Sequence, residues 1–318
     1  MKTIDFHCDA LYKLLDDKEL SFATAMDTES TVNEKLDVTL DRLVEADSLL
    51  QVFAVFVHQS RQNWLLDVLE SIDLFYSHII SHPKMSLVRN QHDLATCIEQ
   101  NKIGAMLSLE GCDGLDGNPA LLRLLHRLGL RALSLTWNNA NWAADGVLEQ
   151  RNAGLSSAGA AFVKQCEELG IILDISHLGE TSFWDLAAIT TRPIIASHSN
   201  AFELCPHPRN LNNNQLKYII ENNGLIGITY VPYFLTTNEQ ATIDDVIRHI
   251  EYICELGGQN SIMLGSDFDG IDQHVLGLAH PGQVNQLKES LYKRFDDALV
   301  EQFLHKNALT FLQQHLPE

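Results

Sequence analysis

Eight short apolar runs are the feature that most constrains the fold of this 318-residue chain. They are rich in β-branched residues, and their positions are Thr3–Phe6, Leu50–Val57, Ile103–Leu109, Arg131–Leu135, Ile171–Ile175, Pro193–Ala196, Leu225–Thr229 and Ile262–Gly265. Most are separated by stretches with the spacing of an amphipathic helix, such as Phe162, Cys166 and Leu169. Near-continuous apolar strands that alternate with such helices are typical of a parallel sheet covered by helices.

The number of these units decides between two parallel architectures. Eight βα units fit a (β/α)8 barrel, which typically needs about 250 residues, better than an open doubly wound sheet. No glycine-rich turn follows the first run, so the dinucleotide-binding sheet lacks its main signature. We therefore predict an α/β fold, a single (β/α)8 (TIM) barrel that occupies residues 1–318 as one domain. Helices within Gln283–Leu316 are expected to close it, and the long 17–48 connection is expected to hold a helix that begins within Asp37–Arg42.

Charge and cysteine usage argue against several classes of partner and location. The formal net charge is −20, and such a field repels phosphate backbones and anionic lipid headgroups, so we expect neither nucleic acid nor a membrane as a partner. The six cysteines are scattered without a CxxC motif, which is typical of a reduced cytosolic protein. No apolar run approaches the roughly 20 residues of a membrane span. The first run begins too early for a signal peptide to precede it, so we expect a cytoplasmic protein.

Metal-ligating side chains follow several of the predicted strands. In a parallel barrel the carboxyl ends of all strands surround one mouth. The residues at these ends are His7 and Asp9 after the first run, Glu110 after the third, His177 after the fifth, His198 after the sixth, and Asp267 and Asp269 after the eighth. His7 and Asp9 emerge on the same side of the chain because side chains alternate along a strand.

These ligands are too many for one metal ion. A tetrahedral zinc ion takes four ligands, whereas two ions that share a bridging carboxylate use more, and the bridge offsets the repulsion between them. Glu110 is the predicted bridge. His7 and Asp9 would complete one metal site. His177 and His198 would complete the other. A water held between the ions ionises near neutral pH and becomes a nucleophile, so we predict a barrel of the metal-dependent hydrolase type.

Proton transfer needs a carboxylate beside that water. We predict Asp267 for this role because it is nearer the strand end, and Asp269, which shares its strand parity, is the alternative. A single His–Asp or Ser–His pair is more often structural, so only the joint placement at several strand ends indicates a metal site. The carboxylates of Asp113, Asp116 and Asp145 lie in polar turns and are expected to be solvated.

Taken in order, the polar motifs resemble one known family, the membrane (renal) dipeptidases, from the first strand to the eighth. The motifs are Asp5-Phe6-His7-Cys8-Asp9, Glu110-Gly111, Ser176-His177, Ser197-His198-Ser199, Cys205-Pro206-His207-Pro208-Arg209-Asn210 and Gly265-Ser266-Asp267-Phe268-Asp269-Gly270. The resemblance implies a binuclear zinc barrel that hydrolyses dipeptides, often with a D-residue at the carboxyl end. It implies that the zinc ligands are His7, Asp9, Glu110 (bridging), His177 and His198. It also implies catalysis by Asp267 and binding of the substrate carboxylate by Arg209, whose planar guanidinium pairs bidentately with carboxylates.

The chain departs from that family after the fourth strand. Vertebrate members carry a substrate-contacting histidine in a Leu-Thr-His segment, and here Trp137 occupies its place. Asn138 is expected to contact the substrate instead, by donating a hydrogen bond to the developing oxyanion. Tyr230 and Tyr233 follow the seventh strand and are further candidates for contact with a dipeptide. The signal and lipid-anchor segments of vertebrate members are not recognised, so we do not extend the family's membrane label to this chain.

The sequence therefore predicts a cytoplasmic zinc dipeptidase with two Zn²⁺ ions per chain and a dipeptide substrate. Manganese or cobalt would also suit nitrogen and oxygen ligands. One alternative is another binuclear barrel hydrolase acting on a cyclic amide, a lactone or a phosphoester, although many of those use a carbamylated lysine where Glu110 stands. The other is a catalytically idle metal-binding or peptide-binding protein. A homodimer is compatible with the sequence, which carries no signal for the oligomeric state.

Overall fold

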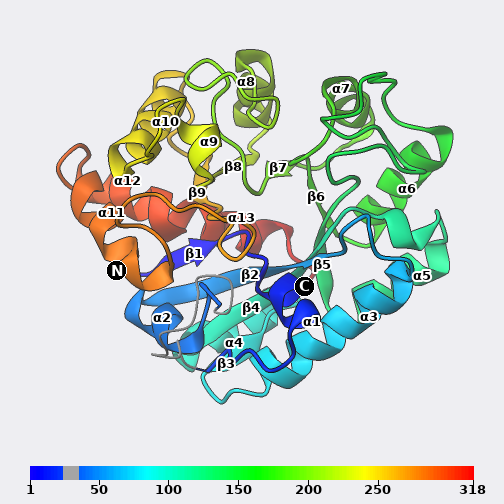
Figure 1. Ribbon diagram of the computed structural model, residues 1–318, viewed down its shortest axis with the longest axis horizontal. Coiled ribbons are helices and arrows are strands. Elements are labelled where there is room, and N and C mark those ends of the chain that lie inside the picture. The colour runs from blue at the N-terminus through cyan, green and yellow to red at the C-terminus, as the bar shows by residue number, and fades with distance from the viewer. Residues whose placement is uncertain (24–35) are drawn as a thin grey trace.

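The computed structural model describes residues 1–23 and 36–318, so part of the long 17–48 connection lies outside the described residues. Eight parallel strands form a ring in the order β2-β1-β9-β8-β7-β6-β5-β4, and pairing of β2 with β4 closes it (Figure 1). The barrel strands are β1 (Thr3–Asp5), β2 (Ser48–Phe56), β4 (Ile103–Glu110), β5 (Leu130–Ser134), β6 (Ile172–Asp174), β7 (Ile195–Ala196), β8 (Leu225–Ile228) and β9 (Ile262–Leu264). Each overlaps one of the eight predicted runs, and the predicted (β/α)8 barrel is confirmed.

One further strand is not among the predicted runs. β3 (Met85–Leu87) pairs with the first residues of β4, Met85 with Ile103 and Leu87 with Ala105. β5 pairs only with the later part of β4, from Leu107 onward. A three-residue strand carries too short a pattern to detect in a sequence. It forms because β4 has eight residues and β5 only five, which leaves the start of β4 without β5 as a neighbour.

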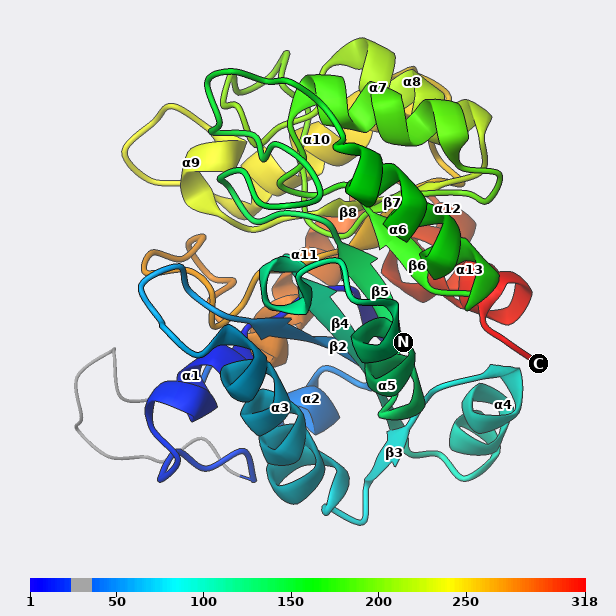
Figure 2. The ribbon, with the colours of Figure 1, turned by 90° about the vertical axis from the view of Figure 1, so that its right-hand side faces the viewer.

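Helices cover the outside of the ring (Figure 2). Their bounds are α1 (Ala10–Asp16), α2 (Leu40–Glu45), α3 (Trp64–Leu74), α4 (Gln91–Glu99), α5 (Pro119–Arg127), α6 (Ser157–Glu168), α7 (Glu180–Ile189), α8 (Asn213–Glu221), α9 (Pro232–Leu235), α10 (Ile243–Glu255), α11 (Val284–Leu291), α12 (Asp297–Glu301) and α13 (Asn307–His315). π-Helical turns extend α3 over Phe75–Ile80 and link α12 to α13 over Gln302–Lys306. Helix α2 begins inside the predicted Asp37–Arg42. Among the residues that the structure describes, no helix combines the length and the apolar character needed to cross a bilayer.

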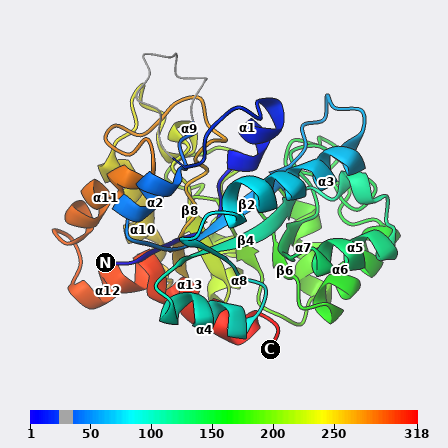
Figure 3. The same cartoon turned by 90° about the horizontal axis from the view of Figure 1, so that it is seen from below.

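The two ends of the barrel are built differently. Figure 3 shows α4 and α13 at one end and α1 and α9 at the other. At the α13 end, Phe311 and Leu312 belong to the same buried apolar cluster as Ile4, Leu50 and Leu225, which lie in the first residues of their strands. The amino-terminal end of the barrel is thereby closed by apolar side chains. The carboxyl ends of the strands, which carry the polar motifs, face the other way.

Candidate active site

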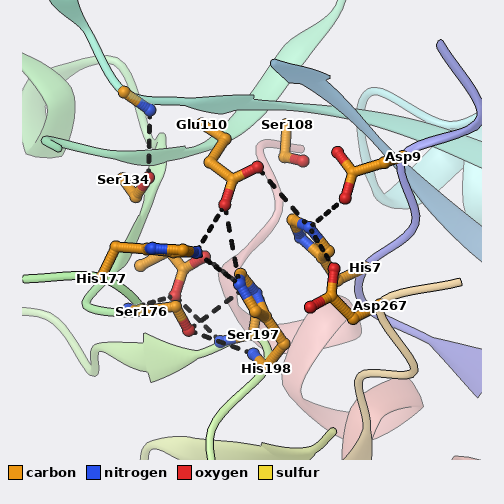
Figure 4. A network of polar contacts seen from close by, with 12 residues as sticks. His7, Asp9, Ser108, Glu110, Ser134, Ser176, His177, Ser197, His198 and Asp267 are labelled. Atoms are coloured by element: carbon orange, nitrogen blue, oxygen red, sulfur yellow. Dashed lines mark hydrogen bonds and ion pairs between the residues drawn. The ribbon is translucent and has the colours of Figure 1, made fainter. Parts of the chain in front are cut away.

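The side chains predicted as metal ligands converge at the carboxyl end of the barrel (Figure 4). The segments that follow β1 and β9 continue to pair beyond the strands themselves. The Asp267 backbone N–H donates to the His7 carbonyl at 3.2 Å, and the Asp9 N–H donates to the Phe268 carbonyl at 2.9 Å. This extension of the ladder places Asp267 beside His7 and Asp9, although more than 250 residues separate them along the chain.

Glu110 is the last residue of β4 and reaches two sets of ligands. Its Oε1 lies 2.8 Å from His177 Nε2 and 3.6 Å from His198 Nε2. Its Oε2 lies 3.7 Å from His7 Nε2, which is itself 3.4 Å from Asp9 Oδ2. The two oxygens of one carboxylate therefore point to two different groups of side chains, as Figure 4 shows.

The donor set fits metal ions. Three groups of side chains each bring their possible ligand atoms within 4.8 Å of one another. The groups are His7, Asp9 and Glu110; Glu110, His177 and His198; and His7, His198 and Asp267. His7 Nε2 and Asp9 Oδ1 are buried without a hydrogen-bond partner among the described residues. Burying such atoms is costly unless something binds them, and a cation at this position would do so.

The two remaining histidines are oriented by their neighbours. His177 Nδ1 lies 2.8 Å from Asn138 Oδ1, which can only accept, so the proton is on Nδ1 and a lone pair on Nε2. His198 Nδ1 lies 2.7 Å from Ser197 Oγ, which donates its own proton to Asp174. The two Nε2 atoms face each other at 2.9 Å. Two lone pairs aimed at one point fit a metal ion, and such outer hydrogen bonds fix ligand orientation.

The electrostatics of this cluster also suit a cation. Burial raises the pKa of Glu110 well above its usual value. The charge of Asp9 adds to this rise, and the charge of His7 opposes it. Burial alone would lower the pKa of His7, but Glu110 and Asp9 outweigh it and raise that pKa to about 10. Burial lowers the pKa of both His177 and His198 well below the usual value. Both are therefore neutral near pH 7, the form in which imidazole binds metals.

Asp267 and Asp269, the two candidates for proton transfer, point to different places. Asp267 Oδ1 lies 3.6 Å from His7 Nε2, and burial raises its pKa to about 8 against the opposing charge of His7. Asp269 accepts a hydrogen bond from the backbone N–H of Asp37 at 2.6 Å and forms an ion pair with Lys13 at 3.1 Å. Asp269 therefore holds the segment that leads into α2, and Asp267 is the carboxylate beside the cluster.

The backbone is unusual at the same positions. His177, Asp267 and Asp269 have φ angles of 70°, 67° and 70°, a left-handed conformation that is uncommon for residues other than glycine. Such conformations persist where the surrounding structure imposes them, and they often mark functional sites. Gly270 is required for a different reason, since a Cβ there would collide with the carboxylates of Asp9 and Asp267. This close approach explains why the Gly265–Gly270 motif ends in glycine.

Arg209 lies on the loop after β7 and lines the same cavity of about 400 Å³ as Asp9, Glu110 and Asp267. Its side chain is almost fully buried, with Nη2 donating to the His198 carbonyl at 3.2 Å. Its Nε has no hydrogen-bond partner among the described residues. A buried guanidinium with donors to spare suits an anionic group of a ligand.

The other predicted residues have mixed outcomes. Trp137, Asn138 and Tyr233 line the cavity, whereas Tyr230 is buried and packs on Phe268. The prediction that Asp145 is solvated is wrong. Asp145 is 1% exposed because its carboxylate pairs with Arg151 and accepts the backbone N–H of Ala153, which folds the loop back over it.

No role in orienting the histidines was predicted for Asp174, Ser197 or Asn138. Ser197 stands in the motif Ser197-His198-Ser199, and Asp174 is the last residue of β6. The pairing of a serine with a histidine in Ser197-His198 was the available signal. Asn138 was predicted for substrate contact only, although it also accepts from His177. Such contacts join neighbouring strands, so a single strand-end motif does not reveal them.

Comparisons with known proteins agree with this geometry. The model of the family "Membrane dipeptidase (Peptidase family M19)" matches residues 1–316. An uncharacterized protein of Klebsiella pneumoniae is 32% identical over 265 residues, covering 78% of this chain and 96% of that protein. A dipeptidase of Aspergillus oryzae is 33% identical over 238 residues, covering 72% of this chain and 56% of the fungal protein.

A solved structure shows the same fold. The crystal structure of a Rhodobacter sphaeroides metallo peptidase, liganded with a phosphinate mimic of the dipeptide L-Ala-D-Ala, superposes with a TM-score of 0.89 at 23% identity and covers 99% of both chains. At this identity the likeness concerns the fold. The family match over nearly the whole chain goes further: the chain belongs to the membrane dipeptidase family and is a metal-dependent hydrolase of the dipeptidase type.

Proposed function

We propose that the protein hydrolyses dipeptides with two zinc ions per chain, held by His7, Asp9, Glu110, His177 and His198. The observation that carries this proposal is the position of Glu110, whose two oxygens face two separate sets of ligands. When bound, the two ions would polarise the scissile carbonyl and lower the pKa of a bound water enough for it to attack. The same ligands would accept manganese or cobalt, so the native metal is part of the proposal.

Asp267 and Asn138 would act on the reacting groups. Asp267 lies beside the ligand cluster, 3.6 Å from His7, where a carboxylate can take the proton of the attacking water and pass it to the leaving amine. Asn138 lines the same cavity, and in this proposal its NH₂ group donates to the developing oxyanion while its Oδ1 orients His177.

Arg209 would bind the substrate carboxylate. The support is its buried position in the cavity wall and the unused donor at Nε. With the carboxylate at Arg209 and the free amino group near the acidic ligands, both ends of the substrate are fixed. We therefore expect tripeptides to be poor substrates, and efficient tripeptide hydrolysis would contradict this arrangement.

The decisive experiment measures metal content per chain together with hydrolysis of an L,L- and an L,D-dipeptide, before and after chelation. We expect two equivalents of metal and turnover that chelation abolishes and added zinc restores. The L/D ratio then defines the stereochemical preference. Two bound metals without dipeptide turnover would contradict the substrate class while keeping the metal site, and a panel of cyclic amides, lactones and phosphoesters would follow.

Variants at Arg209 test the carboxylate contact separately. Arg209→Met should raise KM for dipeptides strongly, while Arg209→Lys, which keeps the charge but loses the bidentate geometry, should lie between. A dipeptide amide, which lacks the carboxylate, should be hydrolysed poorly by the parent protein and lose little further in Arg209→Met. Equal losses for the dipeptide and its amide would point to a structural role.

We also propose that the protein acts in the cytoplasm. All six cysteines lie in the described residues and are free thiols, five of them buried, which suits a reducing compartment. Fractionation of cells that express the full-length gene would test this, and activity in an exported fraction would contradict it.

A further inference from the structure

The wall of the active-site cavity differs between two sides of the barrel rim. Arg209 lines it from the loop after β7, and Tyr233 and Phe234 line it from α9, which follows β8. Phe56 and Trp137 line it from the ends of β2 and β5, and Tyr12 from α1. In the order of the closed ring, β2 and β5 flank β4, and β7 and β8 lie on the far side (Figure 1). The ligand cluster lies between the two sides.

The side with β2 and β5 is a continuous aromatic surface. The ring centroids of Tyr12 and Phe56 are 5.2 Å apart, those of Phe56 and Trp137 5.1 Å, and those of Trp137 and His58 5.6 Å. Phe56 is buried, and Tyr12 and Trp137 are half-buried. These three residues come from different parts of the chain, and Phe56 contacts the rings of both Tyr12 and Trp137.

The charged side chains that line the cavity are not part of the aromatic surface. The formally charged residues that line it belong to the ligand cluster, to Arg209, to the Lys13–Asp269 ion pair, or to the exposed residue Asp272. The aromatic surface thus offers apolar area and π-faces to a ligand. Such a surface binds an aromatic or large apolar group better than a charged one.

We propose that Tyr12, Phe56 and Trp137 form the subsite for the amino-terminal side chain of the substrate, and that the protein prefers dipeptides whose first residue is aromatic or large and apolar. The inference rests on the proposed function for the direction of the substrate. With the carboxylate at Arg209 and the scissile carbonyl over the ligand cluster, the first residue extends away from β7 and towards β2 and β5. Trp137 is then a specificity-determining residue.

The test compares kcat/KM for Phe-Ala, Leu-Ala, Ala-Ala and Asp-Ala with the metal-loaded protein. We expect Phe-Ala to exceed Ala-Ala by about tenfold to a hundredfold, the range that apolar pockets provide, and Asp-Ala to be the poorest. In Trp137→Ala the Phe-Ala to Ala-Ala ratio should fall at least about fivefold, whereas Trp137→Phe should keep most of it. Metal content is measured for each variant because Trp137 is next to Asn138.

Two further measurements keep the test decisive. Trp184→Ala, on the outer helix α7 and packed against Phe183 and Tyr218, removes a tryptophan remote from the cavity and should leave the ratio unchanged. Tyr12→Leu, which keeps an apolar side chain at the edge of the surface, should lower the ratio less than Trp137→Ala. An unchanged ratio in Trp137→Ala, or a preference for Ala-Ala or Asp-Ala in the parent protein, would overturn the subsite.

Failure of the subsite is distinguishable from failure of the proposed function. If no dipeptide is hydrolysed, the function fails, and the subsite is decided by calorimetric binding of Phe-Ala and Ala-Ala to metal-loaded Asp267→Asn. Tighter binding of Phe-Ala that Trp137→Ala removes from this background would support the subsite. Equal binding of the two dipeptides would overturn it.

Discussion

The two ends of the barrel differ in what holds them together. At the carboxyl end, His7, Asp9 and Arg209 each have a buried polar atom without a partner among the described residues, and His177 and Asp267 have left-handed backbones. At the amino end, Phe311 and Leu312 of α13 pack with strand-start residues in an apolar cluster. Among the described residues, the first end holds uncommon backbone conformations and buried polar atoms without hydrogen-bond partners, and the second supplies stability through burial. We therefore expect variants at the carboxyl end to lose function and variants at the amino end to lose stability.

The largest expected effect is on function at the carboxyl end. Glu110→Gln removes a charge that faces both ligand sets, so we expect metal content to fall and kcat/KM to drop at least about 1,000-fold. The metal-free variant should be at least as stable as the metal-free parent, because one of several crowded carboxylates is gone. Metal analysis and thermal unfolding with chelator measure both. A large loss of stability in the metal-free variant would show that the cluster also holds the fold.

The next largest effect is on stability at the amino end. Phe311→Ala should lower the free energy of unfolding by about 3–5 kcal/mol, because Phe311 is buried against the strand starts. Metal content and kcat/KM per folded molecule should stay at the parent values. Gln313→Ala, an exposed position on the same helix, is the control and should change stability by less than about 0.5 kcal/mol. Loss of metal in Phe311→Ala would show that the two ends are coupled.

A smaller effect is expected where the ligands are oriented. Ser197→Ala removes the link between His198 and Asp174, and we expect zinc affinity to weaken about 10–100-fold. Ser71→Ala is the matched control, since Ser71 is also buried but its hydroxyl has no partner among the described residues. Competition with a chromophoric chelator measures both affinities. A zinc affinity of Ser197→Ala equal to that of the parent would mean that packing alone orients His198.

The smallest effect concerns a carboxylate at the amino end. Burial would raise the pKa of Glu167, but hydrogen bonds from Thr190, Thr191 and Arg192 outweigh it and lower that pKa below its usual value. Its stabilisation is therefore complete above the unfolded pKa of about 4.3 and is lost as the pH falls through the folded pKa.

We expect Glu167→Gln to lower the free energy of unfolding by about 1 kcal/mol at pH 7. The difference from the parent should hold down to about pH 5 and shrink in more acidic solution, as chemical denaturation across this range would record. A difference that grows in acid would contradict the assigned direction of the pKa shift. The metal content of the variant should equal that of the parent at each pH.

The predicted barrel and the convergence of the motifs have one physical origin. Parallel strands all end at the same face, so His7, Glu110 and His198 must meet once eight strands are recognised. β3 escaped prediction because Met85–Leu87 pairs only where β5 leaves β4 uncovered. Asp145 was misjudged because its burial depends on Arg151 folding back over it.

Which strands are followed by metal-ligating residues could be predicted from the sequence alone, because periodicity and strand-end residues are local properties of the chain. The sequence favoured Asp267 over Asp269 only because Asp267 is nearer the strand end, since both follow the same strand with the same parity. The tertiary structure gives the two carboxylates different partners, with Asp37 and Lys13 against Asp269 and His7 beside Asp267. It likewise assembled Tyr12, Phe56 and Trp137 into one surface. Contacts between residues far apart in the chain depend on packing in space, and no local pattern records them.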